Sequence, residues 1–247
     1  MPLVFENVTF SYRRSGRLFD RLTLSFHDPV TVVLGPNGAG KSTLLGIAAT
    51  AIRPDSGRVS LDGLVPARKR ELAAYRRRVS WIPQQVTAVP GLRVREQVAY
   101  CGWLKGLSRS EAWDRSIRAL ERVELGDLAG RASGKLSGGQ QRRMAIAQAL
   151  VHEASWVLMD EPTAGLDPGQ RQVFRRLIAE LRETAQIIVS THQTDDLDTV
   201  FDHVVLLAHG RVHHDGGLQS FLGMAPEGTP ETKRAELAYA RYVGNEA

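Results

Sequence analysis

In Gly35-Pro36-Asn37-Gly38-Ala39-Gly40-Lys41-Ser42, glycines and a lysine stand at the spacing Gly-x-x-x-x-Gly-Lys-Ser/Thr. Such a loop lets successive backbone N–H groups point at phosphate oxygens, and a following helix adds the positive end of its dipole. The apolar run 30–34 predicts a buried strand before the loop, and a helix is predicted over 41–51. The order predicts a nucleotide site, with Lys41 neutralising the outer phosphates and Ser42 available to ligate Mg²⁺.

Two carboxylates follow a second apolar run. Residues 156–159 predict a buried strand that runs into Asp160 and Glu161. Ligands bind at the carboxyl ends of strands in an open parallel sheet, so Asp160 suits the surroundings of Mg²⁺ and Glu161 can polarise a water for attack on a γ-phosphate. Acids after a strand can equally cap a helix, and only the phosphate loop favours the catalytic interpretation. A third strand, 187–189, leads to His192 at the same sheet edge.

The remaining patterns alternate between strand and helix, which predicts an α/β architecture with a largely parallel sheet. Ser108 and Glu111 have the spacing of a helix capping box, and Asp167-Pro168 begins a helix with one apolar face. Residues 204–212 predict a late hairpin, and 223–230 resemble a linker. After Thr229-Pro230, a short helix is predicted from residues at helical spacing, namely Ala235, Ala238, Tyr239, Tyr242 and Val243.

Composition indicates an ordinary globular chain of 247 residues, 43% hydrophobic and 24% charged, with one cysteine, Cys101. No apolar run approaches the roughly 18 residues of a membrane span, and the first residues lack a signal-peptide pattern, so a cytosolic location is expected. The net charge of +5 is uneven: residues 1–78 carry +7 and residues 79–247 carry −2. The cationic runs 68–70 and 76–78 favour a solvated helix face or loop over a nucleic-acid groove, because no aromatic residues interleave them. No specific nucleic-acid partner is expected.

A third motif, Leu136-Ser137-Gly138-Gly139-Gln140, resembles the signature of the ATP-binding cassette superfamily, and Gln141-Arg142-Arg143 continues it as is common there. The resemblance runs from residue 4 to about residue 222. It implies a P-loop ATPase core with a parallel sheet, an antiparallel β-subdomain and an inserted helical subdomain over about 85–145. The nucleotide-binding domain would span 1–222, and residues 223–247 would form a C-terminal linker and short helix.

The resemblance also implies roles for single residues. Tyr12 resembles the aromatic residue that stacks on adenine, Gln84 the glutamine that joins the core to the helical subdomain, and His192 the switch histidine near the γ-phosphate. The catalytic set is then Glu161, His192 and Gln84, and the Mg²⁺ ligands are Ser42, Gln84 and Asp160. The ATP-binding set is Tyr12, Gly35, Pro36, Asn37, Gly38, Ala39, Gly40, Lys41, Ser42, Thr43, Ser137, Gly138, Gly139, Gln140 and Asp167.

Two positions depart from the family pattern. Ala164-Gly165 stands where many members carry Ser-Ala, and Gln85 follows Gln84, which is assigned only by its neighbour Pro83. Neither departure removes a catalytic group, so an active ATPase is expected.

In the family, the signature meets the phosphate loop of a second copy. The resemblance therefore implies a head-to-tail pair of cassettes, identical or related, that buries two ATP molecules with Ser137, Gly139 and Gln140 contacting them in trans. It also implies transmembrane permease subunits, docked between Gln84 and the helical subdomain, and a location on the cytoplasmic face of the cell membrane. The docking surface is expected at 98–106, where Tyr100 and Trp103 are either interface anchors or local core.

The form of the chain resembles the cassettes of bacterial exporters. The alternative is a soluble cassette ATPase acting on ribosomes or nucleic acid, encouraged by the basic N-terminal third. Members of that kind generally carry two cassettes, a coiled-coil insertion or zinc modules, and these 247 residues contain none of them.

Overall fold

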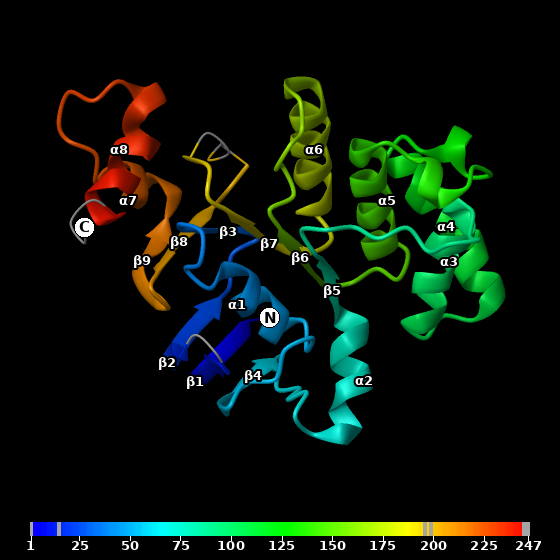
Figure 1. Ribbon diagram of the computed structural model, residues 1–247, viewed down its shortest axis with the longest axis horizontal. Helices are drawn as coiled ribbons and strands as arrows, with labels where there is room; N and C mark the ends of the chain where they lie inside the picture. Colours follow the sequence, from blue (N-terminus) through cyan, green and yellow to red (C-terminus); the bar gives the residue numbers. More distant parts are fainter. Residues whose placement is uncertain (1, 14–15, 195–196, 198–199, 244–247) are drawn as a thin grey trace.

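The computed structural model describes residues 2–13, 16–194, 197 and 200–243. A six-stranded sheet lies at its centre (Figure 1), in the order β5 (Val79–Ile82), β6 (Trp156–Asp160), β7 (Gln186–Thr191), β3 (Val30–Leu34), β8 (His203–Ala208) and β9 (Arg211–Gly217). The first five strands are parallel, and every residue of β3 and β6 is buried. Continuous apolar runs are what a parallel sheet covered on both faces requires, so the predicted α/β class is confirmed. The predicted hairpin is β8 with its antiparallel neighbour β9.

A second, antiparallel sheet lies below the first in Figure 1 and has the order β2 (Gly16–Phe26), β1 (Leu3–Tyr12) and β4 (Ser56–Leu61). One hydrophobic cluster joins the two sheets, since Phe5 and Phe19 of the antiparallel sheet belong to the same buried group as Trp156 and Ile188 of the parallel sheet. The antiparallel part of the predicted fold is therefore confirmed.

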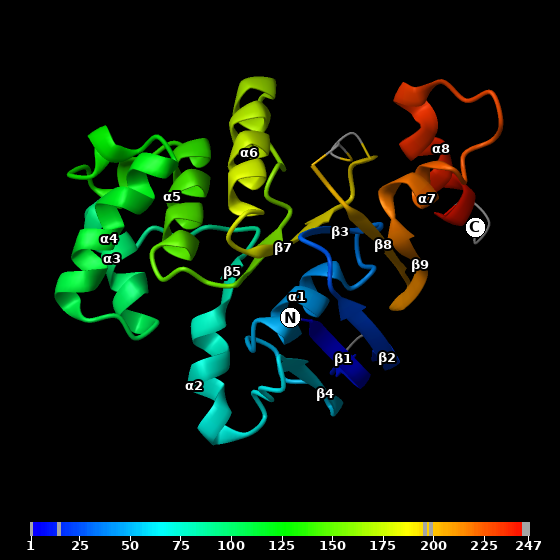
Figure 2. The ribbon, with the colours of Figure 1, turned by 180° about the vertical axis from the view of Figure 1, so that it is seen from behind.

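Eight α-helices lie around these sheets within the described residues. They are α1 (Lys41–Ala48), α2 (Lys69–Arg78), α3 (Val94–Leu104), α4 (Arg109–Arg122), α5 (Gly138–Leu150), α6 (Pro168–Leu181), α7 (Leu218–Leu222) and α8 (Glu231–Val243). Helices α3, α4 and α5 pack together at one end of the molecule, and α7 and α8 lie at the opposite end (Figures 1 and 2). None of the helices in the described part of the chain is long and apolar enough to cross a bilayer.

Helix α1 ends at Ala48, three residues earlier than predicted. Thr50 adopts a left-handed conformation with φ +62°, and the N–H groups of Thr50 and Ala51 donate to the carbonyls of Ile47 and Gly46. This is the bonding pattern of a Schellman motif, which commonly uses glycine at the left-handed position. The prediction failed because a threonine performs that role here.

Contacts within the chain test two further predictions, the capping box at the start of α4 and the setting of the cationic runs. Ser108 Oγ accepts a hydrogen bond from the N–H of Glu111 at 3.2 Å, as predicted for α4. The Glu111 carboxylate pairs with Arg115 at 2.7 Å.

The cationic runs belong to α2 and its N-terminal flank, which confirms the helical interpretation. Some of their guanidinium groups bind within the chain: that of Arg76 donates to Thr50, and that of Arg78 pairs with Asp62.

The C-terminal helix α8 begins directly after Pro230, as predicted. Ala238 is fully buried, and Tyr239 and Tyr242 pack against the main hydrophobic cluster. Tyr242 also approaches Met224 of the preceding segment, with its hydroxyl 2.7 Å from the sulfur. The helix therefore docks on its own chain, while the division of the chain at residue 222 stays a prediction.

Candidate functional site

The phosphate loop leaves β3 and enters α1 at a point of close backbone contact. A Cβ at Gly35 would lie 2.0 Å from the carbonyl oxygen of Leu207 on β8, and one at Gly40 would lie 2.9 Å from the ring of Phe19. Gly40 also has φ +106°, a conformation that L side chains rarely adopt. Both positions thus require glycine, and the loop is held between the two sheets.

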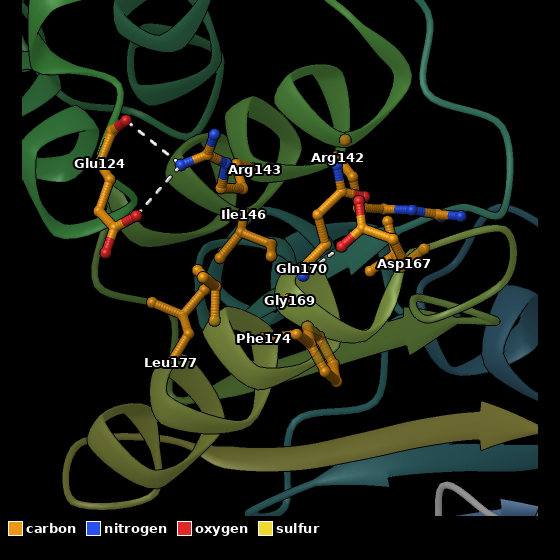
Figure 3. Close-up of a pocket in the computed structure, with 12 residues that line it drawn as sticks. Glu124, Arg142, Arg143, Ile146, Asp167, Gly169, Gln170, Phe174 and Leu177 are labelled. Atoms are coloured by element: carbon orange, nitrogen blue, oxygen red, sulfur yellow. Dashed lines mark hydrogen bonds and ion pairs between the residues drawn. The ribbon is translucent and has the colours of Figure 1, made fainter.

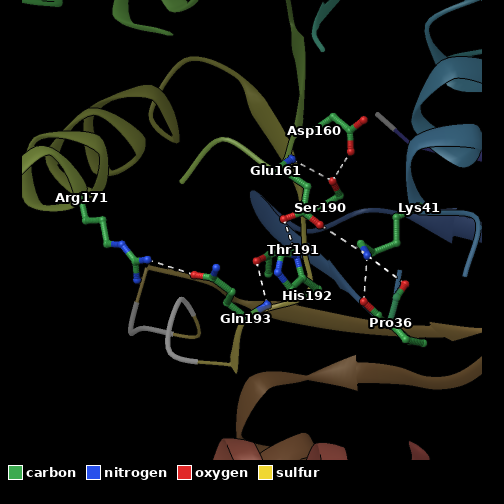
Figure 4. Close-up of polar contacts among 10 residues, drawn as sticks. Pro36, Lys41, Asp160, Glu161, Arg171, Ser190, Thr191, His192 and Gln193 are labelled. Carbon is green, nitrogen blue, oxygen red and sulfur yellow. Dashed lines mark hydrogen bonds and ion pairs between the residues drawn. The ribbon is translucent and has the colours of Figure 1, made fainter. Parts of the chain in front are cut away.

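Lys41, the first residue of α1, is buried beneath this loop (Figure 4). Its Nζ donates to the carbonyl oxygens of Gly35 at 2.8 Å and Pro36 at 3.1 Å, and lies 3.4 Å from Glu161 Oε1. Burial lowers the pKa of the Lys41 amine, and the charges of Glu161 and Asp160 oppose that shift. Phosphates that bind in the loop must compete with these carbonyls and with Glu161 for the ammonium group.

Glu161 lies just beyond β6 in a left-handed conformation, with φ +48°. Such a conformation costs a non-glycine residue about 1–3 kcal/mol, and here the Glu161 N–H donates to both the carbonyl and the Oγ of Ser190 at 3.1 Å. Its second carboxylate oxygen, Oε2, is 2.8 Å from His192 Nδ1. The structure therefore brings the predicted acid, lysine and histidine into one connected group.

Asp160, the last residue of β6, is held by a residue that the sequence analysis missed. Ser190 Oγ on β7 donates to Asp160 Oδ1 at 2.5 Å while accepting the N–H of Glu161. The available signal was a serine directly after three apolar residues of a predicted buried strand. Among the residues that the structure describes, no group of three or more His, Cys, Asp or Glu could hold a metal ion. A Mg²⁺ site would thus draw on mixed oxygen donors and on the phosphates.

A cleft of about 580 Å³ connects these groups to the antiparallel sheet. Its walls include many of the predicted site residues: Tyr12, the loop from Asn37 to Thr43, Gln84 and Glu161. Arg17 and Leu18 of β2 also line it, and no motif marked them. Tyr12 is 44% exposed, its hydroxyl is 2.9 Å from Thr43 Oγ1, and its ring contacts Phe10 edge-on. An open aromatic ring beside the loop suits stacking on a base.

Gln84 and Gln85 line different cavities. Gln84 lines the nucleotide cleft, whereas Gln85 lines a different cavity between β5, α3 and α5. Arg142 of α5 donates to the carbonyl oxygen of Gln84 at 3.0 Å, which fixes the backbone between the two sites. Neighbouring residues of one short segment therefore face two separate sites.

The signature residues lie apart from the phosphate loop of the same chain. Ser137 caps α5: its Oγ accepts the N–H of Gln140, and Gln140 Oε1 accepts the N–H of Ser137. This reciprocal capping box, Ser-x-x-Gln, was readable from the sequence and was missed. Ser137 and Gly138 are exposed, so this end of α5 presents its N–H groups to the surface.

Asp167 caps the neighbouring helix α6, with Oδ1 accepting the N–H of Gln170 at 2.9 Å. The Gln170 side chain lies against Gly139, where a Cβ would meet it at 2.7 Å. Between α5 and α6 is a cavity of about 250 Å³ with Phe174 and Leu177 in its wall (Figure 3). The structure thus joins Asp167 to the signature, and not to Lys41.

Tyr100 and Trp103 are not core residues. They are 44% and 45% exposed, and their rings lie 5.8 Å apart on the outer side of α3. Both line a surface cavity shared with Trp113 of α4, whereas Cys101 and Lys105 line the cavity that contains Gln85. The local-core alternative is therefore wrong, and the two aromatic rings lie outside the cavity beside Gln85.

Known proteins resemble this chain in sequence and in fold. Residues 20–164 match the family described as ABC transporter. The cobalt import ATP-binding protein CbiO of Rhodobacter capsulatus is 37% identical over 224 residues, 89% of this chain and 80% of that protein. YxlF of Bacillus subtilis, an uncharacterized ABC transporter ATP-binding protein, is 32% identical over 220 residues, 88% of this chain and 71% of that protein.

One solved structure is particularly informative about the site. It is a dimeric ATP-binding cassette, MJ0796, in a post-hydrolysis state bound to ADP and Pi, with a TM-score of 0.78 and 28% identity. The alignment covers 88% of this chain and 99% of that chain. It confirms the P-loop cassette fold predicted from the three motifs.

Replacing Tyr12 tests the adenine side of the cleft. Tyr12→Ala removes the ring and should weaken ATP binding by about 1–3 kcal/mol, roughly five- to 150-fold in Kd, by analogy with base–aromatic stacking. Tyr12→Phe keeps the ring and loses only the hydroxyl contact with Thr43, so its affinity should stay close to that of the parent. Titration calorimetry with ATP measures both. Equal losses in the two variants would assign the role of Tyr12 to its hydroxyl and refute stacking.

Proposed function

The chain belongs to the ABC transporter family, and we propose that it is the ATP-hydrolysing subunit of a transporter, acting at the cytoplasmic face of a membrane. It binds ATP and is an ATPase. The observation that carries the proposal is the contact of Glu161 with both Lys41 and His192 beside the phosphate loop. Phosphoryl transfer to water uses a cation at the phosphates and a residue that orients the water. Here Lys41 lies at the phosphate loop, and Glu161, held by His192, can orient the water.

Lys41 is the group that contacts the outer phosphates. Once its ammonium leaves the carbonyls of Gly35 and Pro36 for phosphate oxygens, one carboxylate oxygen of Glu161 is released from the ion pair. That carboxylate can then orient the attacking water and accept its proton. His192 holds the other oxygen of Glu161 and fixes the direction of the carboxylate. Binding of ATP thus frees the base that hydrolyses it.

The residues beside the loop also fit Mg²⁺. A carboxylate, a hydroxyl and an amide oxygen, from Asp160, Ser42 and Gln84, are hard oxygen donors of the kind that Mg²⁺ prefers. Ser42 and Gln84 line the same cleft, and Asp160, which accepts a hydrogen bond from Ser190, directly precedes Glu161 in its wall. When bound, the ion would neutralise charge on the β- and γ-phosphates.

Two copies would assemble head to tail around ATP. The capped N-terminus of α5, with Ser137, Gly139 and Gln140, does not line the cleft of its own chain and can donate N–H groups to a nucleotide held by the partner. Such a contact is self-complementary, so each copy completes the other's site. ATP then joins the two copies and hydrolysis separates them, a movement that permease subunits would convert into transport. The partner cassette is a second copy or a related chain.

Export is the direction we propose, because the compact form of the chain resembles the cassettes of bacterial exporters. The relative CbiO is named for cobalt import, which is the observation against it. Inside-out membrane vesicles that contain the whole transporter distinguish the two directions, with the compound that stimulates ATP hydrolysis as the probe. ATP added outside should drive this compound into the vesicles. ATP-driven release of preloaded compound would identify an importer.

The Glu161→Gln variant tests the proposed function. It keeps the size of the side chain but removes its basicity, so turnover should fall by about 10²–10⁴-fold while ATP binding persists. Unhydrolysed ATP should then hold two copies together. Light scattering after size exclusion should give twice 27.2 kDa with ATP and 27.2 kDa without it.

The matched control adds Ser137→Arg to Glu161→Gln. A long cation in the partner's nucleotide contact should abolish the dimer and leave ATP binding to the monomer intact. If Glu161→Gln hydrolyses ATP at the parental rate, the assignment of Glu161 as the base is wrong. A dimer that survives Ser137→Arg would instead refute the head-to-tail arrangement.

A further inference from the structure

Helix α2 carries a concentration of positive charge that the proposed function does not use. The segment 68–78, which comprises α2 and the residue before it, contains six lysine or arginine residues and a single acid, Glu71. Its net charge of +5 equals that of the whole chain. The sequence predicts a solvated helix face here, and the structure shows which of these cations are neutralised within the chain.

Two of the six cations are paired with acids of the same chain. Arg68 contacts Glu71 at 3.0 Å, and Arg78 contacts Asp62 at 2.9 Å. The second carboxylate oxygen of Glu71 accepts the N–H of Val65 at 2.6 Å, so both oxygens of the acid in α2 have partners. None of the ion pairs found in the described part of the chain includes the following three cations of α2: Lys69, Arg70 and Arg77.

These three cations lie on one side of α2. Tyr75 is the one buried residue of this helix, all of which the structure describes, and its hydroxyl donates to a carbonyl oxygen at the end of α1 at 2.6 Å. At 3.6 residues per turn, four exposed positions lie opposite this side chain, namely Lys69, Arg70, Ala73 and Arg77. Because the methyl group of Ala73 is short, the three long side chains around it can contact one flat surface together.

Helix α2 lies at an outer edge of the molecule. It protrudes at the lower edge in Figures 1 and 2, whereas α8 lies near the upper edge. Its last turn contacts the end of α3: Lys105 Nζ donates to the carbonyl oxygen of Arg76 at 2.8 Å. The guanidinium group of Arg77 lies over Gly106, where a Cβ would be 2.8 Å from its Nε. The surface 98–106, which is expected to meet permease subunits, therefore adjoins α2.

We propose that the exposed face of α2 binds anionic lipid headgroups of the membrane through Lys69, Arg70 and Arg77. Each Lys or Arg near an anionic bilayer surface strengthens binding about fivefold. The contact is electrostatic, because the side chain of Ala73 is too short to enter the hydrocarbon. The inference goes beyond the proposed function, in which permease subunits bring the chain to the membrane, and gives this chain a lipid contact of its own. The orientation of α2 toward a membrane rests on that function, whereas its charge does not.

A nucleic-acid backbone carries the same charge as these headgroups, but two observations favour a bilayer. Proteins that bind single strands without sequence preference combine a positive groove with aromatic residues that stack on the bases. Tyr75, the single aromatic residue of α2, is buried, so the cationic face offers no such ring. The face also adjoins the surface that is expected to meet the membrane subunits.

Cosedimentation of the full chain with lipid vesicles tests the contact. Vesicles of phosphatidylcholine and phosphatidylglycerol in a two-to-one ratio are anionic, and vesicles of phosphatidylcholine alone are the neutral reference. The parent should bind the anionic vesicles more strongly, and added salt should weaken that binding because salt screens the charges. The triple variant Lys69→Gln, Arg70→Gln and Arg77→Gln should bind them more weakly on the order of 100-fold, the product of three losses of about fivefold.

The matched control removes the same amount of charge elsewhere. Arg118→Gln, Arg122→Gln and Arg211→Gln together replace three exposed arginines of α4 and β9, and this variant should bind anionic vesicles nearly as well as the parent. Parental ATPase activity and thermal unfolding of both triple variants in solution check that each is folded.

The contradicting outcomes are distinct. If the parent binds anionic and neutral vesicles equally, or the α2 variant binds like the control, the lipid contact is wrong. The proposed function then still stands, because neither measurement depends on ATP hydrolysis. Binding of duplex RNA by the parent but not by the α2 variant, without binding to vesicles, would assign the face to a nucleic-acid backbone and overturn the lipid proposal. Parental turnover in Glu161→Gln would instead refute the assigned base and leave vesicle binding unchanged.

Discussion

A buried ion pair between Lys41 and Glu161 is the constraint on which the rest of the site depends. Each partner is almost completely enclosed, and a buried charge is tolerated only when opposite charge and hydrogen bonds compensate it. The carbonyls of Gly35 and Pro36 supply those bonds for the lysine, and His192 supplies one for the glutamate. In the proposed function, phosphate oxygens would take over the ammonium group of Lys41, so ligand binding and release of the base would be one event.

The sheet order produces this pair from distant parts of the chain. The phosphate loop follows β3, and the two acids lie at the end of β6. Ser190 and His192 lie at the end of β7, which is between those two strands. Parallel pairing places all three carboxyl ends at one edge. The signature at the start of α5 lies elsewhere, on the cluster of α3, α4 and α5. The phosphate loop and the signature thus lie on different parts of one chain, as the proposed head-to-tail pair would require.

The features predicted correctly from the sequence depend on short-range order. A strand, a glycine-rich loop and a helix are contiguous, as are the apolar residues before Asp160, so these elements could be predicted from local spacing. The end of α1 was misplaced because Thr50 adopts a conformation usually left to glycine. The different surroundings of Gln84 and Gln85 and the exposure of Trp103 depend on how distant segments pack. No local pattern contains that information.

The central claim is that ATP takes Lys41 from the loop carbonyls and thereby releases Glu161. A crystal structure of the Glu161→Gln variant with ATP and Mg²⁺ tests it most directly. The account predicts Lys41 Nζ in hydrogen-bond contact with the outer phosphates and no longer with Gly35 and Pro36, and the same nucleotide in contact with Ser137 of a second copy. ATP bound in the cleft while Lys41 still donates to those two carbonyls would contradict it.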